Sequence, residues 1–499
     1  MPPMSYGRAM ARLAEQDPDA DAVLCAEERR GYDALERRSR AELERRSNRL
    51  ARAYVRLGVR EGDLVTVSLP NGCELLEACL AAWKLGATPN PIPTRLPELE
   101  RRALVELARP ALWVGGEPGA RGGRASVPAG FEPGPDDDCG PLPDRVSAHV
   151  RAMTSGGSTG RPKLIVERAP ALCDPDAPEN GMRAGGTTLT PGPLHHAGPF
   201  ITTWQQILCG GRVVLMQRFE PEEALRLIER HRVTWVLFVP TMMQRIWRLP
   251  AVLRESFDLS CLERVMCTGA PSPEWLKRAW IGWLGAERIW EAYGGSERIA
   301  GCVISGEEWL AHPGSVGKPP PGRKIEARRA DGSVCAPGEV GELWMLPAGG
   351  PGSTYFYVGA EPTADAAGWE SVGDMGFFDA DGYLHLVDRK TDMILVGGAN
   401  VFPAEVEAAL DAHPKVRSSA VIGLPDEDLG QRIHAIVDTA GEPVSEAELR
   451  EHLGERLARH KLPRSFELVA EPLRDDAGKV RRSALREARL PRRGEARPS

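Results

Sequence analysis

The chain has 499 residues, of which 42% are hydrophobic, and its formal net charge is −7. That length exceeds what one hydrophobic core supports, so two or more domains are expected. The acidic balance gives no electrostatic reason to expect a nucleic acid or an anionic membrane as partner. No segment approaches the roughly 20 apolar residues of a membrane-spanning helix, and residues 1–16 lack a signal-peptide core. The ten cysteines are scattered without a Cys-x-x-Cys pair, which favours free thiols in a cytoplasmic protein over zinc or disulfides.

Helix and strand patterns alternate in the first part of the chain. Residues 39–59 and 74–85 have the spacing of amphipathic helices, and residues 63–69 and 111–114 have the pattern of strands. This alternation predicts a parallel, layered α/β domain. The Gly-, Pro- and Asp-rich residues 115–144 predict an exposed connection.

A glycine- and hydroxyl-rich loop, Thr-Ser-Gly-Gly-Ser-Thr-Gly-Arg-Pro-Lys, follows at residues 154–163, after a predicted strand at 149–153. Glycines let a backbone wrap closely around an anion, hydroxyls donate to phosphate oxygens, and Lys163 supplies charge. The sequence therefore predicts a phosphate-holding loop rather than a surface turn. It is not a Walker A loop, because Lys163 is followed by Leu164 instead of serine or threonine.

The alternation resumes beyond this loop. Strands are predicted at 212–216, 233–239, 264–267 and 288–290, and helices at 221–231 and 272–284. Two turns, 269–271 and 293–297, follow strands, where open parallel sheets bind ligands. Strands at 324–329, 339–345 and 383–388 predict a small antiparallel β unit, and residues 391–486 a compact α+β unit. The basic residues 490–499 predict a disordered tail.

Five landmarks occur in an order that resembles the adenylate-forming superfamily, which includes acyl-CoA synthetases and nonribosomal-peptide adenylation domains. They are residues 154–163, 293–297, 373–374, 388–407 and 478–479. The resemblance covers about residues 39–486. It implies a large N-terminal adenylation domain, residues 1–389, of layered α/β subdomains plus a small antiparallel β unit. A small mobile α+β C-terminal domain, residues 390–499, would carry the catalytic lysine.

The resemblance also implies a site for ATP and Mg²⁺. The phosphates would be held by Thr154, Ser155, Gly156, Gly157, Ser158, Thr159, Gly160 and Lys163. AMP would be bound by Gly269, Ala270, Pro271, Tyr293, Gly294, Ser296, Asp374 and Arg389, with Asp374 and Arg389 on the ribose. The catalytic residues would be Lys479, His196 and Glu297, with Glu297 as the metal ligand. Whether His195 or His196 takes the family's histidine position is left open.

The chemistry of the reaction explains why the site would contain the positive charges of Lys163, Lys479 and Mg²⁺. A carboxylate is ionised at pH 7 and needs no general base. The obstacle is that two anions must meet, so positioning and positive charge should dominate catalysis. Lys479 lies in a diverged motif, Leu-Arg-Asp-Asp-Ala-Gly-Lys, which lacks the proline and threonine frequent in the family. The geometry of its loop is therefore an open question.

In this family the C-terminal unit swings after adenylation to let a thiol in. The resemblance places the hinge at Lys390 and Thr391, and the pantetheine tunnel of coenzyme A at Gly397, Gly398 and Asn400. Threonine is stiff, so the hinge is expected to involve its neighbours.

The acid substrate is expected to be bulky and hydrophobic: fatty, aryl or polycyclic. Residues 199–208 contain no acidic side chain that could hold the ammonium of an amino acid. The expected pocket walls are apolar and include adaptable methionines. They are His196, Phe200, Trp204, Val239, Met242, Met243, Cys267 and Gly295.

The leading interpretation is an acyl-CoA ligase that converts acid, ATP and CoA to acyl-CoA, AMP and pyrophosphate. An acyl-AMP ligase that loads the phosphopantetheine arm of a carrier protein is an alternative. A catalytically silent nucleotide-binding homologue is another, but Lys163, Glu297 and Lys479 are all present, which argues against it. The expected partners are a small carboxylic acid and CoA or a carrier protein, with no nucleic acid and no membrane span. A homodimer is left open.

Overall fold

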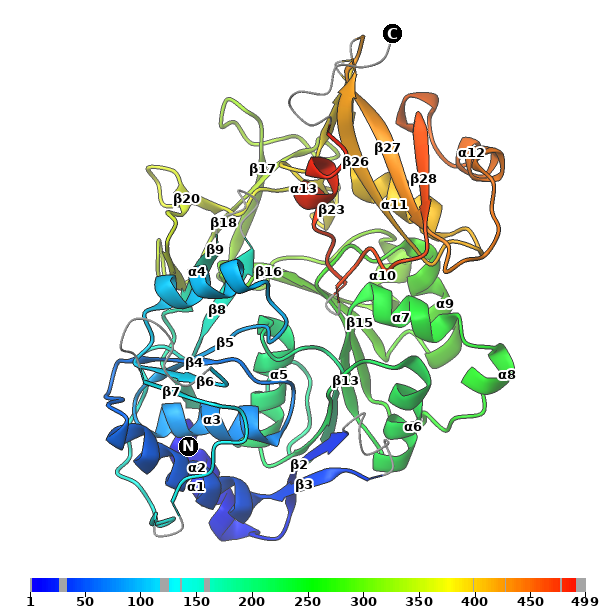
Figure 1. Ribbon diagram of the computed structural model, residues 1–499. Coiled ribbons are helices and arrows are strands. Elements are labelled where there is room, and N and C mark those ends of the chain that lie inside the picture. Colours follow the sequence, from blue (N-terminus) through cyan, green and yellow to red (C-terminus); the bar gives the residue numbers. More distant parts are fainter. Residues whose placement is uncertain are drawn as a thin grey trace.

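The computed structural model describes residues 2–26, 34–116, 125–134, 137–156, 162–397, 399–426, 428–475 and 478–490, with backbone only at 155 and 156. No helix in these ranges is long and apolar enough to cross a membrane. The last residues of the predicted tail, 491–499, lie outside them. Figure 1 shows the C-terminal unit, coloured orange to red, above the larger N-terminal layers.

The first layer is a four-stranded parallel sheet with the order β5-β4-β6-β7. The helices α2 and α3 form where the sequence predicts them, whereas α1 and α4 were not predicted. The helix α2 begins with a capping box in which Ser39 and Glu42 exchange hydrogen bonds. The strand β7 lies inside the predicted exposed connection, a three-residue segment too short to show a strand pattern. The elements are β4 (Leu64–Val67), β5 (Thr88–Pro91), β6 (Leu112–Val114), β7 (Ala125–Val127), α1 (Tyr6–Gln16), α2 (Arg40–Arg56), α3 (Cys73–Lys84) and α4 (Glu98–Ala108).

The central layer is an eight-stranded sheet with the order β16-β15-β14-β13-β11-β12-β2-β3. Its inner strands are parallel, and only the two edge strands run antiparallel. The strands are β2 (Asp21–Ala26), β3 (Glu36–Ser39), β11 (Thr187–Thr190), β12 (Arg212–Met216), β13 (Trp235–Phe238), β14 (Arg264–Cys267), β15 (Ile289–Gly294) and β16 (Gly301–Ser305).

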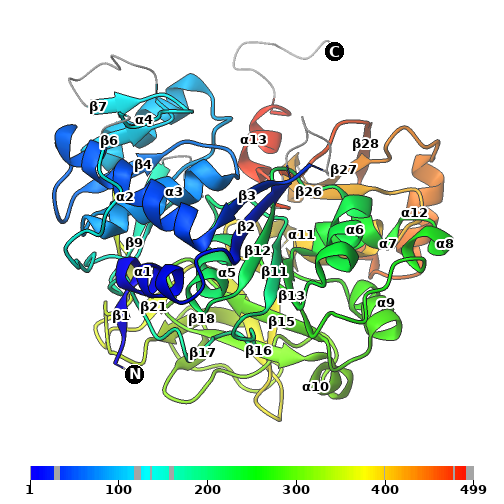
Figure 2. The same ribbon diagram turned by 90° about the horizontal axis from the view of Figure 1, so that it is seen from below.

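Helices cover both faces of this sheet (Figure 2). One core packs α1, α3 and α5 against it, and the other packs α6, α7 and α9. The helices are α5 (Ala197–Leu208), α6 (Pro221–His231), α7 (Pro240–Trp247), α8 (Ala251–Arg254), α9 (Glu274–Leu284) and α10 (Gly306–Ala311). The carboxyl ends of the parallel strands point toward the C-terminal unit (Figure 1), and open parallel sheets bind ligands at that edge.

Two antiparallel sheets and one short pair complete the N-terminal part. The strand patterns after residue 313 predict the larger of the two sheets, and the smaller sheet and the short pair were not predicted. The six-stranded sheet contains β17 (Lys324–Arg328), β18 (Gly341–Leu346), β20 (Thr363–Ala364), β21 (Glu370–Ser371), β22 (Asp374–Phe378) and β23 (Leu384–Arg389). The three-stranded sheet is β19-β9-β8, formed by β8 (Ala152–Gly156), β9 (Pro162–Glu167) and β19 (Tyr355–Val358). The short pair is β1 (Met4–Ser5) with β10 (Leu172–Cys173).

The C-terminal unit has its own sheet and its own hydrophobic core. This confirms the prediction of a compact α+β unit, while the exact boundary at residue 389 stays a prediction. The elements are β24 (Ile394–Val396), β25 (Ala399–Val401), β26 (Ser418–Asp426), β27 (Gly430–Asp438), β28 (Ser465–Val469), α11 (Pro403–Asp411), α12 (Glu446–Gly454), the 3₁₀ turn η2 (Arg459–Lys461) and α13 (Arg482–Glu487).

Candidate active site

Asp374 and Tyr293, two of the predicted AMP-binding residues, meet across the N-terminal part. The phenol of Tyr293 donates a 2.7 Å hydrogen bond to Oδ2 of Asp374. Arg389, opposite Asp374 in the β22–β23 ladder, places Nε 3.3 Å from Oδ1. Burial raises the pKa of Asp374, and the charge of Arg389 counteracts that rise. The structure therefore holds a partly buried, charge-compensated carboxylate at the start of β22, next to the end of β15.

A second cluster joins Glu297 and Lys163. The ammonium of Lys163 lies 3.8 Å from Oε1 of Glu297, and the phenol of Tyr357 donates to the same oxygen at 2.7 Å. Lys163 also lies over the Tyr357 ring, 3.7 Å from its centroid. Burial lowers the pKa of Lys163, and Glu297 opposes that shift. Sequence reasoning missed Tyr357, because its place here depends on β19 pairing with β9, which carries Lys163.

The loop that was predicted to hold phosphate is flanked by the β8–β9 ladder, in which Ser155 pairs with Lys163 and Gly156 with Pro162. Thr154 lies in β8, paired with Leu164. The remaining predicted phosphate-binding residues, Gly157, Ser158, Thr159 and Gly160, lie outside the described residues.

Two residues of the same turn, Gly295 and Arg298, determine the position of the Glu297 carboxylate. A Cβ atom at Gly295 would lie 2.8 Å from Oε2 of Glu297, so glycine leaves room for the carboxylate. Arg298 has a positive φ of 53°, an uncommon backbone conformation for a residue with a side chain. Its guanidinium lies 3.2 Å from Glu167, which also forms a buried 2.6 Å ion pair with Arg151. These ion pairs compensate the strain at Arg298 and fix the turn that carries Glu297.

These residues fit a magnesium ion bound mainly by substrate phosphates. No cluster of three or more metal-ligating side chains occurs in the described ranges. Glu297 offers one hard oxygen donor next to a lysine suited to phosphate. Magnesium is commonly bound through one or two carboxylates together with substrate phosphates, so the donor set is appropriate.

Lys479 reaches the same cleft from the C-terminal unit. The cleft walls desolvate its ammonium and lower its pKa, although the side chain keeps solvent access. Asp475 and Glu297 raise this pKa, and Arg389 lowers it. Lys479 therefore lies close to both clusters of the N-terminal part.

The Lys479 loop answers the question left by its diverged sequence motif. The backbone amide of Lys479 donates to Oδ1 of Asp475 at 2.8 Å, and the amide of Asp475 donates to the carbonyl of Lys479 at 3.0 Å. Gly478 has a φ of 75°, and a Cβ there would lie 2.6 Å from Oγ1 of Thr241. Asp475 thus closes the turn, and glycine permits close contact with α7.

His196 is the N-cap residue of α5, and its ring lies 4.5 Å from the ring of His195. Burial lowers the pKa of His196 to about 2, and the charges of Lys479 and then His195 contribute. His196 is therefore neutral at pH 7. Which of His195 and His196 takes the family's histidine position stays a prediction.

Five of the expected walls of the acid pocket are buried in the hydrophobic cores. Phe200 and Trp204 pack with Trp83 in the core beneath α5, whereas Met242, Met243 and Cys267 belong to the core on the opposite face of the sheet. The apolar pattern could not distinguish a pocket wall from a core. These five residues contribute to core packing, and their role as walls of an acid pocket stays a prediction.

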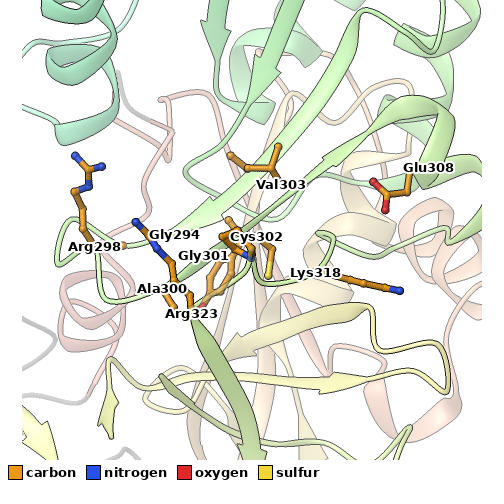
Figure 3. A pocket seen from close by; sticks show the side chains of 13 residues that line it. Gly294, Arg298, Ala300, Gly301, Cys302, Val303, Glu308, Lys318 and Arg323 are labelled. Carbon is orange, nitrogen blue, oxygen red and sulfur yellow. The ribbon is translucent and has the colours of Figure 1, made fainter. Parts of the chain in front are cut away.

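Two other expected walls do lie at the cleft. Val239 precedes α7 and would lie 3.3 Å from a Cβ at Gly269. Gly295 borders a cavity of about 470 Å³, which is also lined by Tyr293, Gly294, Ala300 and Gly301. Figure 3 shows this cavity along the β15–β16 hairpin, with Arg298 toward one end and Lys318 and Glu308 toward the other.

The other predicted AMP-binding residues surround the same edge of the sheet. Gly269, Ala270 and Pro271 follow β14, and Gly269 has the positive φ of a tight turn, 91°. Gly294 ends β15, which runs four residues beyond its predicted end at Trp290, and Ser296 follows in the turn.

The predicted hinge and tunnel residues lie beyond β23. The amide of Lys390 donates to Gly373, and its ammonium to Glu342 at 2.9 Å. Thr391 is exposed. Gly397 and Asn400 lie in the β24–β25 hairpin, where Gly397 has a φ of 55°, and Gly398 lies outside the described residues. Their roles stay predictions.

Comparison with known proteins agrees with this arrangement. The family model for AMP-binding enzymes matches residues 10–356, and the model for the C-terminal domain of AMP-binding enzymes matches residues 405–479. A feruloyl-CoA synthase from Amycolatopsis sp is 35% identical over 492 residues, covering 95% of this chain and 97% of the relative. A fatty acid–[acyl-carrier-protein] ligase from Streptomyces coeruleorubidus is 30% identical, over 95% of this chain and 94% of that relative.

A solved structure with the same fold contains the expected ligands. It is o-succinylbenzoate coenzyme A synthetase from Bacillus subtilis in complex with ATP and a magnesium ion. The two chains are 26% identical and superpose with a TM-score of 0.77, over 96% of this chain and 98% of that one.

Proposed function

The chain belongs to the AMP-binding enzyme family and is an AMP-forming acid–CoA ligase, and on that premise we propose that it activates a bulky, hydrophobic, aromatic acid. In the first step the carboxylate attacks the α-phosphorus of ATP, and pyrophosphate leaves. In the second step the thiol of CoA attacks the acyl carbon of the adenylate and AMP leaves. ATP, Mg²⁺ and CoA are the cofactors.

The observation that carries this proposal is the position of Lys479: its neighbour Gly478 lies against Thr241 and Val239 of the N-terminal part, and its charge acts on His196 and Glu297 from a separate unit of the chain. A cation at this place would stabilise the charge that develops between the carboxylate and the α-phosphate. Neutral His196 would contact the acid without adding charge. Since the carboxylate needs no general base, this positioning suffices for the first step.

The nucleotide would occupy the two N-terminal clusters. Asp374 would accept hydrogen bonds from the ribose hydroxyls, assisted by Arg389, with Tyr293 against the adenine. Lys163 and the 154–163 loop would hold the β- and γ-phosphates. Glu297 would hold magnesium, which neutralises phosphate charge when bound.

The C-terminal domain would begin at residue 390 and turn on Lys390 and Thr391 after the first step. Gly397, Gly398 and Asn400 would then line the pantetheine tunnel. Cytoplasmic location and a homodimer are further expectations, and sedimentation at several protein concentrations would test the second.

The aromatic class rests on three supports. The helix that follows His196 has no acidic residue to pair with an ammonium, and Gly294 and Gly295 open the cavity beside Tyr293. The similarity to feruloyl-CoA synthase over 95% of the chain points the same way. Hydroxycinnamic acids are therefore the first substrates to test.

The test is AMP release with ATP, Mg²⁺ and a panel of acids, measured with and without CoA, with products checked by mass. The panel contains hydroxycinnamic acids, o-succinylbenzoate, fatty acids of several lengths and phenylalanine. We expect steady AMP release with CoA, an acyl-CoA mass for an aromatic acid, and no turnover of phenylalanine. Turnover of phenylalanine alone, or of no acid, would overturn the proposal.

Transfer of the acyl group to a carrier protein is a second candidate activity of the same ligase, favoured by the similarity to a fatty acid–[acyl-carrier-protein] ligase. It predicts that a phosphopantetheinylated carrier protein also consumes the acyl adenylate. Adding such a carrier to the same assay separates the two candidates.

A further inference from the structure

The short helix α7 (Pro240–Trp247) connects the cleft with the C-terminal unit. At its first turn, Thr241 contacts Gly478, next to Lys479. At its other end, Arg248 is the C-cap residue. The buried side chains of Met242, Met243 and Ile246 anchor the helix in the core, so both ends are held by the N-terminal part.

Arg248 contacts three backbone carbonyls of the C-terminal unit and thereby bridges the two parts of the chain. Its Nη1 donates to the carbonyl of Arg417 at 2.7 Å, and its Nη2 donates to the carbonyls of Val416 and Asp411, the latter at 3.3 Å. The buried side chain of Gln244, one turn earlier, also donates to the carbonyl of Asp411 at 3.3 Å. These four bonds end on the last residue of α11, Asp411, and on the segment that follows it.

The chemistry of this contact favours arginine. The last carbonyls of a helix have no partner within the helix and carry partial negative charge. Asp411 ends α11, and a planar guanidinium can donate to several such oxygens at once, whereas an ammonium is a single point charge. The neighbouring protein partly buries Arg248, which lowers its pKa, while Asp411 and Asp438 oppose that shift.

Other contacts also cross the boundary. Arg481 pairs with Glu100 at 3.3 Å, but 65% of the Arg481 side chain is exposed, and exposed ion pairs contribute little. At the first turn of α11, the backbone amide of Ala404 donates to Oδ2 of Asp388 in β23 at 2.8 Å. Arg248 holds the opposite, C-terminal end of the same helix with charge-assisted hydrogen bonds.

We propose that Arg248, assisted by Gln244, is a positioning residue that holds the C-terminal unit over the cleft so that Lys479 reaches the reacting groups. The proposal rests on the proposed ligase function. Arg248 contacts neither nucleotide nor acid and acts through Lys479. It matters for the adenylation step, in which Lys479 is needed, and not for the attack of CoA on a preformed adenylate.

The test compares Arg248→Ala and Arg248→Lys with Arg226→Ala, which removes an exposed arginine that pairs only within α6. Adenylate formation is measured with the acid that the wild-type protein turns over, and thioester formation is measured from supplied acyl adenylate plus CoA. We expect Arg248→Ala to slow adenylation roughly 10- to 100-fold, as the loss of charge-assisted hydrogen bonds predicts, with thioester formation unchanged. Arg248→Lys should lie in between, and Arg226→Ala should match wild type.

A double variant separates positioning from general damage. If Arg248 acts through Lys479, adding Arg248→Ala to Lys479→Ala should cause no further loss of adenylation. Equal loss in both half-reactions, a further loss in the double variant, or no loss with Arg248→Ala would overturn the proposal.

A readout without activity keeps this test distinct from that of the proposed function. Because the charge of Lys479 lowers the pKa of His196, displacement of Lys479 should raise it. The NMR titration of His196 in Arg248→Ala should then shift upward, in the same direction as expected for Lys479→Ala. An unchanged titration would contradict the positioning role, whatever acid the enzyme uses.

Discussion

The phenol of Tyr357 donates to Oε1 of Glu297 at 2.7 Å, and the face of the same ring lies 3.7 Å from the ammonium of Lys163. One uncharged side chain therefore orients both the proposed magnesium ligand and the proposed phosphate-binding lysine. The β19–β9 pairing, with Val358 opposite Leu164, makes this possible because it brings Tyr357 beside the strand of Lys163.

Tyr357→Phe should weaken Mg²⁺-dependent ATP binding. The substitution keeps the ring under Lys163 and removes only the hydrogen bond to Glu297, which frees the carboxylate to rotate. A hydrogen bond to a charged group contributes about 1.5–3 kcal/mol, so ATP affinity at fixed Mg²⁺ should fall roughly 10- to 100-fold. Titration calorimetry at several Mg²⁺ concentrations measures this change in ATP affinity.

Tyr383→Phe is the matched control, because the phenol of Tyr383 also donates to a glutamate, Glu308, at 2.7 Å. That bond lies away from the phosphate cluster, and ATP affinity should not change. Equal losses of ATP affinity in the two variants would show that the effect does not depend on the hydrogen bond between Tyr357 and Glu297.

Asp374 should determine the preference for ribose over deoxyribose. Wild type should bind ATP roughly tenfold more tightly than 2′-deoxy-ATP, because the deoxy sugar lacks one donor to the carboxylate. Asp374→Asn should reduce that preference as well as overall affinity. An undiminished preference in the variant would place the ribose elsewhere.

His196 should remain neutral throughout the working pH range. Its pKa in the folded protein is about 2 and its ordinary value is 6.5, so the unfolded chain binds more protons between these values. The stability that this difference contributes is complete above pH 6.5 and is lost as the pH falls toward 2. NMR should show no titration of His196 between pH 8 and 5 in the wild type. Lys479→Ala should raise the pKa without restoring 6.5, because burial remains.

Trp204 should affect stability more than the acid KM. Trp204 is buried in contact with Trp83, and truncation of a buried tryptophan costs about 3–5 kcal/mol. Trp204→Ala should therefore lower the thermal midpoint clearly and leave the acid KM of the folded protein nearly unchanged. Val252→Ala, at a side chain that is 87% exposed, should change neither. A large KM change with little loss of stability would return Trp204 to the pocket wall.

Local sequence signals located most of the elements. The helix predicted at 221–231 has the bounds of α6, because Pro221 suits the first helical position and the apolar spacing is clear. The strand predicted at 264–267 coincides with β14. By contrast, β2 (Asp21–Ala26) was not predicted, since a short apolar run is ambiguous until a neighbouring strand pairs with it.

The site was only partly predictable, because several of its contacts join distant segments. The resemblance named Glu297, Asp374 and Lys479 in advance, and the structure brings them to one cleft. Nothing local in the sequence distinguishes Tyr357 from a packing aromatic or Arg248 from a solvated helix end. Both acquire their contacts only through long-range packing.

The measurement that tests the account most directly is the separation of the two half-reactions in Lys479→Ala. The account places Lys479 beside the α-phosphate in the first step only. Adenylate formation should therefore fall roughly 100- to 1000-fold, the usual cost of removing a group that stabilises a transition-state charge. Thioester formation from supplied acyl adenylate and CoA should proceed near the wild-type rate. Normal adenylation in this variant, or an equal loss in both steps, would contradict the central claim.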